Sequence, residues 1–207
     1  IADLMGQTEE QQATGENVSR FRVIDQMAEQ TPPGADGLIF LPYLMGERSP
    51  VWDPEACGVF FGLSFSSTKG HMYRAVMEGA AYSLRHNLEV AEQAGAGVKD
   101  LISIGGAAGS PFWMQIKADI CKKVFWEADD DGFASARGAA VLAGLGAGCY
   151  RAVPDHIKAS HTKGKATYPR KEYASRYDDL YAIYRSLYPN TREQMKERVK
   201  AVGDIKI

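Results

Sequence analysis

The feature that most constrains the fold is a short apolar run, LISI, that leads into a glycine-rich loop and then a helix, in SIGGAAGSPFWMQIKADI. Ser110, followed by proline, is typical of a helix N-cap. Backbone N–H groups point outward at such a strand-to-helix junction, where the helix dipole favours an anion. The loop glycines Gly105, Gly106 and Gly109 therefore either let a ligand approach the backbone or only turn the chain tightly. Their spacing matches neither the phosphate loop nor the dinucleotide motif, so both interpretations stay open.

Strands and helices are predicted to alternate along most of the chain. One helix is a long one over Lys69–Ala94, where apolar residues recur at steps of four. Such alternation is typical of an α/β fold with a mainly parallel sheet. The other predicted helices cover 19–30, 111–122 and 136–145, and the predicted strands are GLIFLPYL, VFFGLSF, LISI and VFWEA.

Two changes in composition divide the chain. Residues 1–16 are polar and rich in Gln and Glu, and we expect a loop or the remnant of a preceding segment. Residues 17–165 form one large domain, and residues 166–207 a helical tail that packs on it. The tail carries tyrosines at spacings of three and four, expected to be a packing stripe with hydroxyls at its rim: Tyr173, Tyr177, Tyr181, Tyr184 and Tyr188.

Composition argues against several functional classes. The 207 residues are 45% hydrophobic and 24% charged, which is close to an ordinary globular domain with a core. A net charge of −2 gives no reason to expect nucleic acid or an anionic membrane as partner. Three cysteines without a CxxC pair fit a reducing cytoplasm. The first residues show neither a signal-peptide pattern nor an initiator Met, and we expect the chain to be part of a longer one.

Four segments, in order, resemble the C-terminal domain of the FGGY family of carbohydrate kinases. The first is LPYLMGERSPVWDPEACGVFFGLS, and the second is GVFFGL followed after seven residues by HMYRAVME. The third is IGGAAGSPFWMQIKADI, similar to the family's adenosine-binding segment, and the fourth is SARGAAVLAGLGAG. The resemblance runs from about Pro32 to Tyr188. LPYLMGERSP and VFFGL look most like xylulose kinases, although gluconate, fuculose, rhamnulose and glycerol kinases share much of this framework.

The resemblance implies a ribonuclease-H-like domain of the actin and hexokinase type, with a mixed, partly parallel sheet flanked by helices. In such kinases ATP is held largely by this domain. By the same resemblance, Gly105 and Gly106 approach the nucleotide with their backbones, Ala107 lies where the family has Gly or Ala, and the Ser110 side chain can reach adenine or ribose. Gly109 departs from the larger residues often found there, which implies a looser loop.

Two segments of the family are missing from this sequence, namely the GDxxA-like segment with the catalytic Asp and the phosphate hairpin. We therefore predict no catalytic residue and no metal ligand in this chain, and no activity of the chain alone. The sugar and Mg²⁺ would be held mainly by the N-terminal kinase domain of the same parent chain, its expected partner. The alternative is a non-catalytic nucleotide-binding or oligomerisation module. The sugar, and whether the protein is a homodimer, stay open.

Other polar residues have mostly structural interpretations. The Gly46-Glu47-Arg48 loop either makes an interdomain or near-substrate contact or is braced by an internal ion pair. Glu78 is expected to pair with Arg74 on a helix surface. Asp119 is expected to brace a neighbouring element rather than bind Mg²⁺. The run of aspartates at 129–131 is expected to be a solvated turn, HTKGKATYPRK a solvated connection, and the histidines lack zinc spacing.

Overall fold

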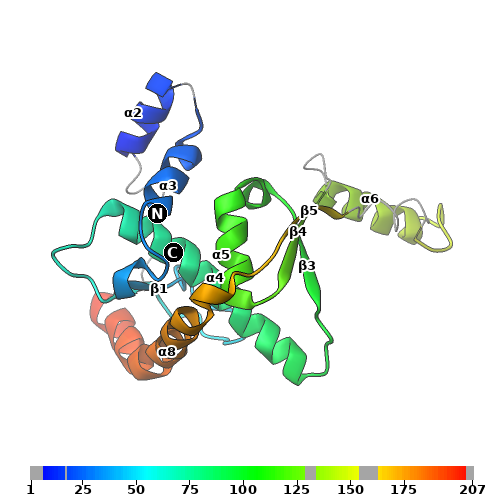
Figure 1. Ribbon diagram of the computed structural model, residues 1–207. Helices are drawn as coiled ribbons and strands as arrows, with labels where there is room; N and C mark the ends of the chain where they lie inside the picture. Colours follow the sequence, from blue (N-terminus) through cyan, green and yellow to red (C-terminus); the bar gives the residue numbers. More distant parts are fainter. Residues whose placement is uncertain (1–6, 17, 129–133, 154–162, 204–207) are drawn as a thin grey trace.

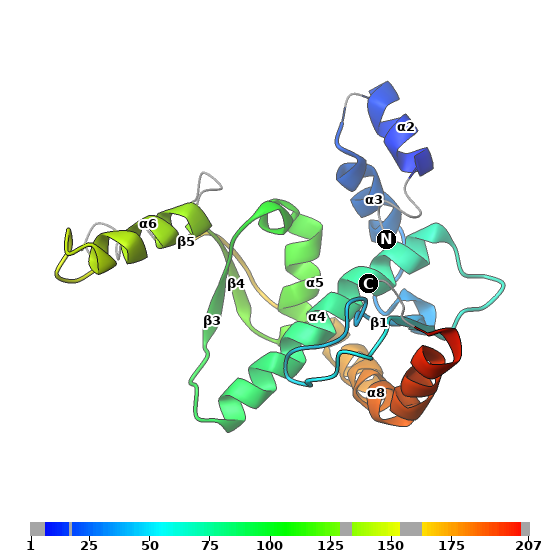
Figure 2. The ribbon, with the colours of Figure 1, turned by 180° about the vertical axis from the view of Figure 1, so that it is seen from behind.

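The computed structural model describes residues 7–16, 18–128, 134–153 and 163–203 (Figure 1). The long helix α4 runs through the middle of the molecule, and α6 extends away from the rest in both views (Figures 1 and 2). The helices are α2 (Gln7–Glu16), α3 (Arg20–Glu29), α4 (Lys69–Gln93), α5 (Pro111–Cys121), α6 (Ala134–Gly146) and α8 (Ala174–Val202). The strands are β1 (Ile39–Leu41), β2 (Val59–Phe61), β3 (Asp100–Ser103), β4 (Val124–Ala128) and β5 (Lys163–Thr167). Three short 3₁₀ turns are η1 (Ala35–Gly37), η2 (Gly106–Gly109) and η3 (Lys171–Tyr173).

The strands form two separate sheets. β3, β4 and β5 lie side by side in that order, with β3 parallel and β5 antiparallel to β4. β1 and β2 form an antiparallel pair of their own. The predicted mixed, partly parallel sheet flanked by helices is confirmed, whereas the expectation of a mainly parallel sheet holds only for β3 and β4.

Strand β5 corrects the prediction that HTKGKATYPRK is a solvated connection. Its sequence, KGKAT, has no alternating apolar face, so periodicity could not reveal it. Pairing with β4 through the backbone makes it a strand, and the strand crosses the boundary that we placed between residues 165 and 166.

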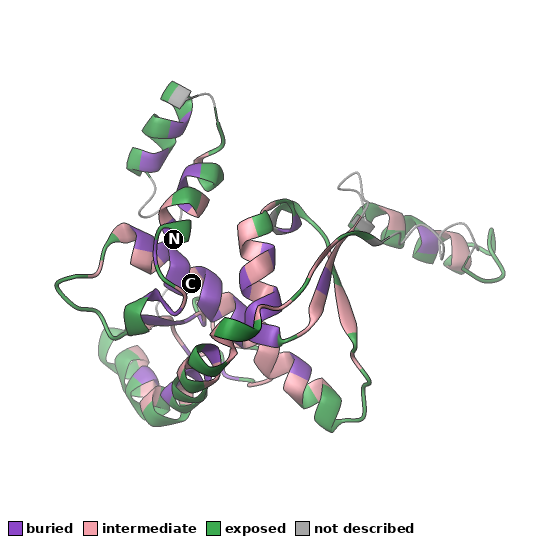
Figure 3. Ribbon diagram, in the orientation of Figure 1, coloured by how far each residue is buried: buried purple, intermediate pink, exposed green. Residues whose placement is uncertain are grey.

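Helix α4 forms where its apolar pattern predicts it and is bounded by local signals at both ends. The Thr68 N–H donates to Nδ1 of His71 at 3.2 Å, and Gly95, with φ +92°, follows the last turn. Strand β1 packs against this helix at Gly79, where a Cβ would overlap the Phe40 carbonyl oxygen. This close approach places β1 in the interior, with all three of its residues buried (Figure 3).

The Arg74–Glu78 pair is buried, which corrects its interpretation as a surface ion pair. Both residues are 2% exposed, and Nε of Arg74 donates to Oε1 of Glu78 at 2.7 Å. Glu78 also accepts from the Gly34 N–H at 2.9 Å and from the Tyr177 hydroxyl at 2.9 Å. Arg74 donates to the carbonyl oxygen of Thr31 at 2.7 Å. The pair therefore joins α4 to α8 and to the segment between α3 and β1.

The tyrosine stripe of α8 packs into the same core, as expected. Tyr177, Tyr181 and Tyr184 are buried, and the ring of Tyr82 on α4 contacts all three. Their hydroxyls are not all at a rim, because the Tyr177 hydroxyl binds the buried Glu78. Packing against α4 thus explains the spacing of the tyrosines.

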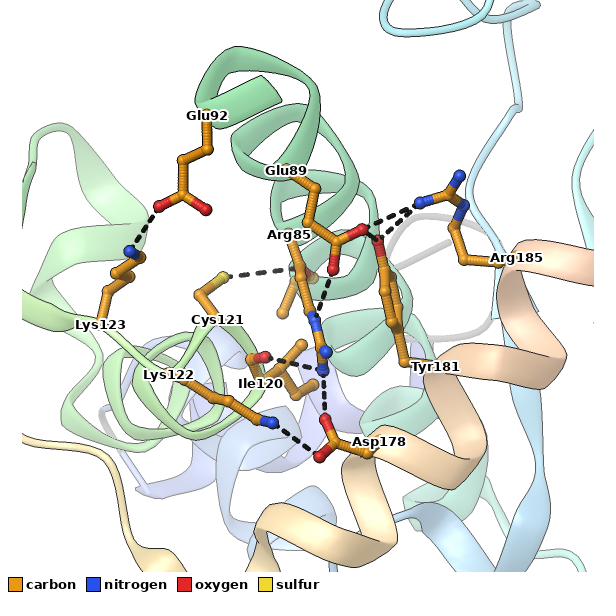
Figure 4. A network of polar contacts seen from close by, with 11 residues as sticks. Arg85, Glu89, Glu92, Ile120, Cys121, Lys122, Lys123, Asp178, Tyr181 and Arg185 are labelled. Carbon is orange, nitrogen blue, oxygen red and sulfur yellow. Dashed lines mark hydrogen bonds and ion pairs between the residues drawn. The ribbon is translucent and has the colours of Figure 1, made fainter. Parts of the chain in front are cut away.

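A charged network joins α4, α5 and α8 near the C-terminal end of α4 (Figure 4). Nη1 of Arg85 donates to Asp178 at 2.9 Å, and Lys122 reaches the other oxygen of that carboxylate at 2.6 Å. Glu89 accepts from the Tyr181 hydroxyl at 2.8 Å. Burial raises the pKa of Asp178, but the hydrogen bonds from Lys122 and Arg85 outweigh it, so this pKa lies below its ordinary value.

The N-terminal segment is helical, so the loop expected over residues 1–16 is wrong for Gln7–Glu16. The sequence of α2 has no apolar face, and periodicity could not predict it. Its support is tertiary: Ala13 is buried, and the buried Glu9 forms an ion pair with Lys69 at 3.1 Å. Within the described part of the chain, no helix is both long and apolar enough to cross a membrane. The aspartates at 129–131 lie outside the described residues.

We predict that Glu78→Gln lowers the free energy of unfolding by about 3–5 kcal/mol, because it leaves the Arg74 charge buried without its counterion. Urea unfolding measures the loss. The matched control is Glu193→Gln, which breaks an exposed pair with Lys196 and should cost less than about 0.5 kcal/mol. Equal losses in the two variants would contradict the structural role of the buried pair.

Candidate functional site

The glycine-rich loop lies between the end of β3 and the beginning of α5, as the sequence predicts. The Gly105 backbone has φ 79° and ψ −178°, and the turn η2 follows it. Within the turn, the Ala108 N–H donates to the Gly105 carbonyl oxygen at 2.9 Å. The Trp113 N–H donates to Oγ of Ser110 at 3.1 Å, which confirms Ser110 as the N-cap of α5. The N-terminus of an eleven-residue helix therefore adjoins the loop.

A hollow of about 320 Å³ opens beside the loop. The carboxyl ends of the parallel strands β3 and β4 form one side of it, which is where ligands sit in open α/β sheets. Its described lining consists of Ser103, Ile104, Gly105, Gly106, Ala108, Gly109, Glu127 and Ala128.

Two of the loop glycines are not required by the protein's own packing. Gly105 needs to be glycine, because its φ and ψ lie in a region that side chains essentially exclude. Gly106 and Gly109 have no positive φ, and a Cβ built on either meets no atom within 4 Å. Their backbones thus lie open to the hollow, so a ligand can approach the chain closely there.

The four predicted site residues do not all face this hollow. Gly105 and Gly106 line it, Ala107 contributes its backbone to the η2 turn, and Ser110 does not line it. Oγ of Ser110 donates to Oδ2 of Asp25 at 2.7 Å while it accepts from Trp113. Its hydroxyl hydrogen is therefore engaged by α3. A contact between Ser110 and adenine or ribose stays a prediction.

The carboxyl group of Asp25 has a shifted pKa. Burial raises the pKa of its carboxyl above the ordinary value, and the hydrogen bond from Ser110 opposes that shift. Both groups hold the end of the loop against α3.

Sequence reasoning missed two polar residues of the hollow, Ser103 and Glu127. They are direct partners in the parallel β3–β4 register. The rule that ligands sit at the carboxyl ends of parallel strands could have found both, since each stands at or next to the end of its predicted strand.

The side-chain ammonium group of Lys117 lies close to this edge of the sheet. Nζ of Lys117, on α5, lies 3.4 Å from Oγ of Ser103 and 4.9 Å from the centre of the Trp113 ring. Burial lowers the pKa of Lys117 below its ordinary value.

The remaining polar candidates have structural partners. Asp119 is buried and accepts from the backbone and the guanidinium of Arg170, so its predicted bracing role is confirmed. Glu47 accepts from the backbone N–H groups of Arg48 and Ser49, so hydrogen bonds brace that loop, and among the described residues neither Glu47 nor Arg48 forms an ion pair. Among the residues with described positions, no three His, Cys, Asp or Glu side chains form a group that could hold a metal ion.

A second hollow, of about 240 Å³, lies away from the glycine loop. Tyr43, His86 and Arg185 are among its lining residues. Arg185 donates to Glu89 at 2.9 Å, and burial, together with the Arg185 charge, lowers the pKa of His86. None of the residues in the glycine loop belongs to it.

The sequence is similar to those of known carbohydrate kinases. The family model described as the C-terminal domain of the FGGY family of carbohydrate kinases matches residues 1–147. A xylulose kinase of Bacillus subtilis is 33% identical over 174 residues, which are 84% of this chain and 34% of that protein. A gluconokinase of Bacillus licheniformis is 35% identical over 193 residues, 90% of this chain and 36% of that protein. The chain thus spans about a third of the length of the curated relatives it matches.

The fold is also similar to that of solved sugar kinases. The crystal structure of a ligand-bound xylulose kinase from Lactobacillus acidophilus superimposes with a TM-score of 0.74 at 26% identity. The match covers 88% of this chain and 36% of that one.

We predict that alanine substitution destabilises the fold at Gly105 but not at Gly106, because the two glycines differ in backbone conformation. Gly105→Ala should lower the free energy of unfolding by about 1–3 kcal/mol, because alanine is strained at that φ and ψ. Gly106→Ala should change it by less than about 0.5 kcal/mol, because its Cβ meets open space. Urea unfolding of both variants provides the test, and a large loss for Gly106→Ala would show that the fold itself requires this glycine.

Proposed function

The chain belongs to the FGGY family of carbohydrate kinases as a C-terminal domain, and from this we propose that it is the ATP-binding half of a sugar kinase. The reaction proposed is transfer of a phosphoryl group from MgATP to a sugar hydroxyl. The observation that carries the proposal is the hollow beside Gly105 and Gly106, at the carboxyl ends of parallel strands and next to a helix N-terminus.

The residues present fit a nucleotide at this place. Gly106 and Gly109 leave the space that a Cβ would fill, which permits close approach of the backbone to a ligand. In our proposal the loop holds the adenosine end of ATP. ATP supplies the transferred phosphoryl group, while this chain binds and orients it. We assign no catalytic residue to the chain and expect it to be inactive alone, with Mg²⁺ and the sugar held mainly by another domain.

The sugar we favour is a ketose similar to xylulose. The support is that a xylulose kinase and a xylulose kinase structure are among the relatives, although a gluconokinase is similar over more of the chain. A cytoplasmic location is also proposed, and the free thiols of Cys57, Cys121 and Cys149 fit it.

We predict that the chain binds ATP and that Gly106→Asp weakens binding by about a hundredfold or more, because a carboxylate fills the approach and repels phosphate. Isothermal titration calorimetry measures the affinity. Gly97→Asp is the matched control, since Gly97 is exposed, has open space around its Cβ and lies outside the hollow. Unchanged affinity in Gly106→Asp, or an unmodified chain that binds no ATP, would overturn the site.

The sugar and the reaction are tested on the longer protein that contains this domain. Phosphorylation is assayed with pentuloses, hexuloses, polyols and gluconate, and a ketose such as xylulose is expected to be the preferred substrate. A protein that binds ATP and phosphorylates none of these would favour the alternative, a non-catalytic nucleotide-binding or oligomerisation module.

A further inference from the structure

Glu127 is the one acidic side chain in the described lining of the hollow. It lies on β4, directly opposite Ser103 of β3, and β4 contacts the η2 turn that carries the loop glycines. Glu127 thus lines the same hollow as the loop backbone that we propose to contact the nucleotide.

The alternation of β4 gives the direction of this side chain. Phe125, two residues earlier, is buried in a cluster with Met114 and Ala118 of α5. Side chains two residues apart share one face of a strand. Glu127 also pairs with Ser103, whose hydroxyl lies 3.4 Å from Nζ of Lys117 on α5, so Glu127 points to the face that α5 covers, beside the loop.

The Glu127 carboxylate has no hydrogen-bond or ion-pair partner among the residues that the structure describes, although it is partly buried. The buried carboxylates elsewhere in the described chain are satisfied differently. Asp119 accepts from Arg170, and Glu78 accepts from Arg74, Gly34 and Tyr177. A carboxylate removed from part of its water gains from a donor, and a ligand in the hollow can supply that donor.

The chemistry of a carboxylate restricts which part of a nucleotide can meet it. An ionised carboxylate only accepts hydrogen bonds, and it repels phosphate oxygens of like charge. The vicinal hydroxyls of a ribose offer two donors to its two oxygens, the arrangement by which acidic residues recognise ribose at the carboxyl ends of other parallel strands.

We propose that Glu127 accepts hydrogen bonds from the ribose hydroxyls of the bound nucleotide and so makes the site prefer ribonucleotides over 2′-deoxyribonucleotides. This rests on the proposed function, because it requires a nucleotide in the hollow. It adds a specificity-determining residue, and it orients the ligand with its sugar toward β4 and its phosphates away from Glu127.

The test compares ADP with 2′-deoxy-ADP in the absence of divalent metal, so that metal coordination cannot contribute. Dissociation constants are measured by calorimetry for the unmodified chain, Glu127→Ala and Glu127→Gln. The unmodified chain should bind ADP about tenfold more tightly than 2′-deoxy-ADP, as expected for a hydroxyl bound to a charged acceptor. Glu127→Ala should bind both nucleotides alike, and no more tightly than the unmodified chain binds 2′-deoxy-ADP. Glu127→Gln keeps one acceptor oxygen and should retain part of the preference.

The matched control is Glu172→Ala, because Glu172 is an exposed glutamate outside the hollow and its loss should leave the tenfold preference intact. Urea unfolding verifies that each variant folds, and Glu127→Gln replaces Glu127→Ala if the alanine variant does not.

The possible failures are distinguishable. If the unmodified chain binds both nucleotides equally, or if folded Glu127 variants keep the full preference, the inference about Glu127 is wrong while the nucleotide site stands. A preference that appears only when Mg²⁺ is added would show that the carboxylate acts on a metal ion, which also contradicts ribose recognition. If the unmodified chain binds neither nucleotide, the proposed function fails and the inference fails with it.

Discussion

The buried Arg74–Glu78 pair is the interaction on which the rest of this structure depends. Two opposite charges that are each 2% exposed can be tolerated only if their remaining donors and acceptors are also bound. Glu78 accepts from Gly34 and Tyr177, and Arg74 donates to the carbonyl oxygens of Ala28 and Thr31. One pair on α4 therefore fixes the end of α3, the turn before β1 and the helix α8.

The same elements support the glycine loop. Helix α3, whose end accepts from Arg74 through Ala28, also holds the loop through the Asp25–Ser110 hydrogen bond of 2.7 Å. Helix α5 packs against α4 and against Phe125 of β4, so the loop is anchored at its helical side. A hollow with open glycine backbones on a fixed frame is suited to a ligand, because little needs to be ordered on binding.

The sequence predicts correctly those elements that depend on interactions between residues close together in the chain. The β3–loop–α5 unit, the Ser110 cap and the long helix α4 all follow from turn chemistry and apolar spacing, and the structure confirms them. Tertiary context decided the rest. Arg74 and Glu78 at i and i+4 look the same in sequence whether exposed or buried, and neither β5 nor α2 has an apolar face. Glu127 was missed although its place near the end of a predicted strand marks it as a candidate, whereas its pairing with Ser103 is decided by tertiary structure.

Titration of the chain with ADP, followed through its backbone amide NMR signals, tests whether a nucleotide contacts the glycine loop, as we propose. We expect saturable shifts concentrated at Gly105, Gly106 and Gly109 and at the ends of β3 and β4. Shifts absent from the loop, or concentrated instead around the second hollow at Tyr43 and His86, would contradict it.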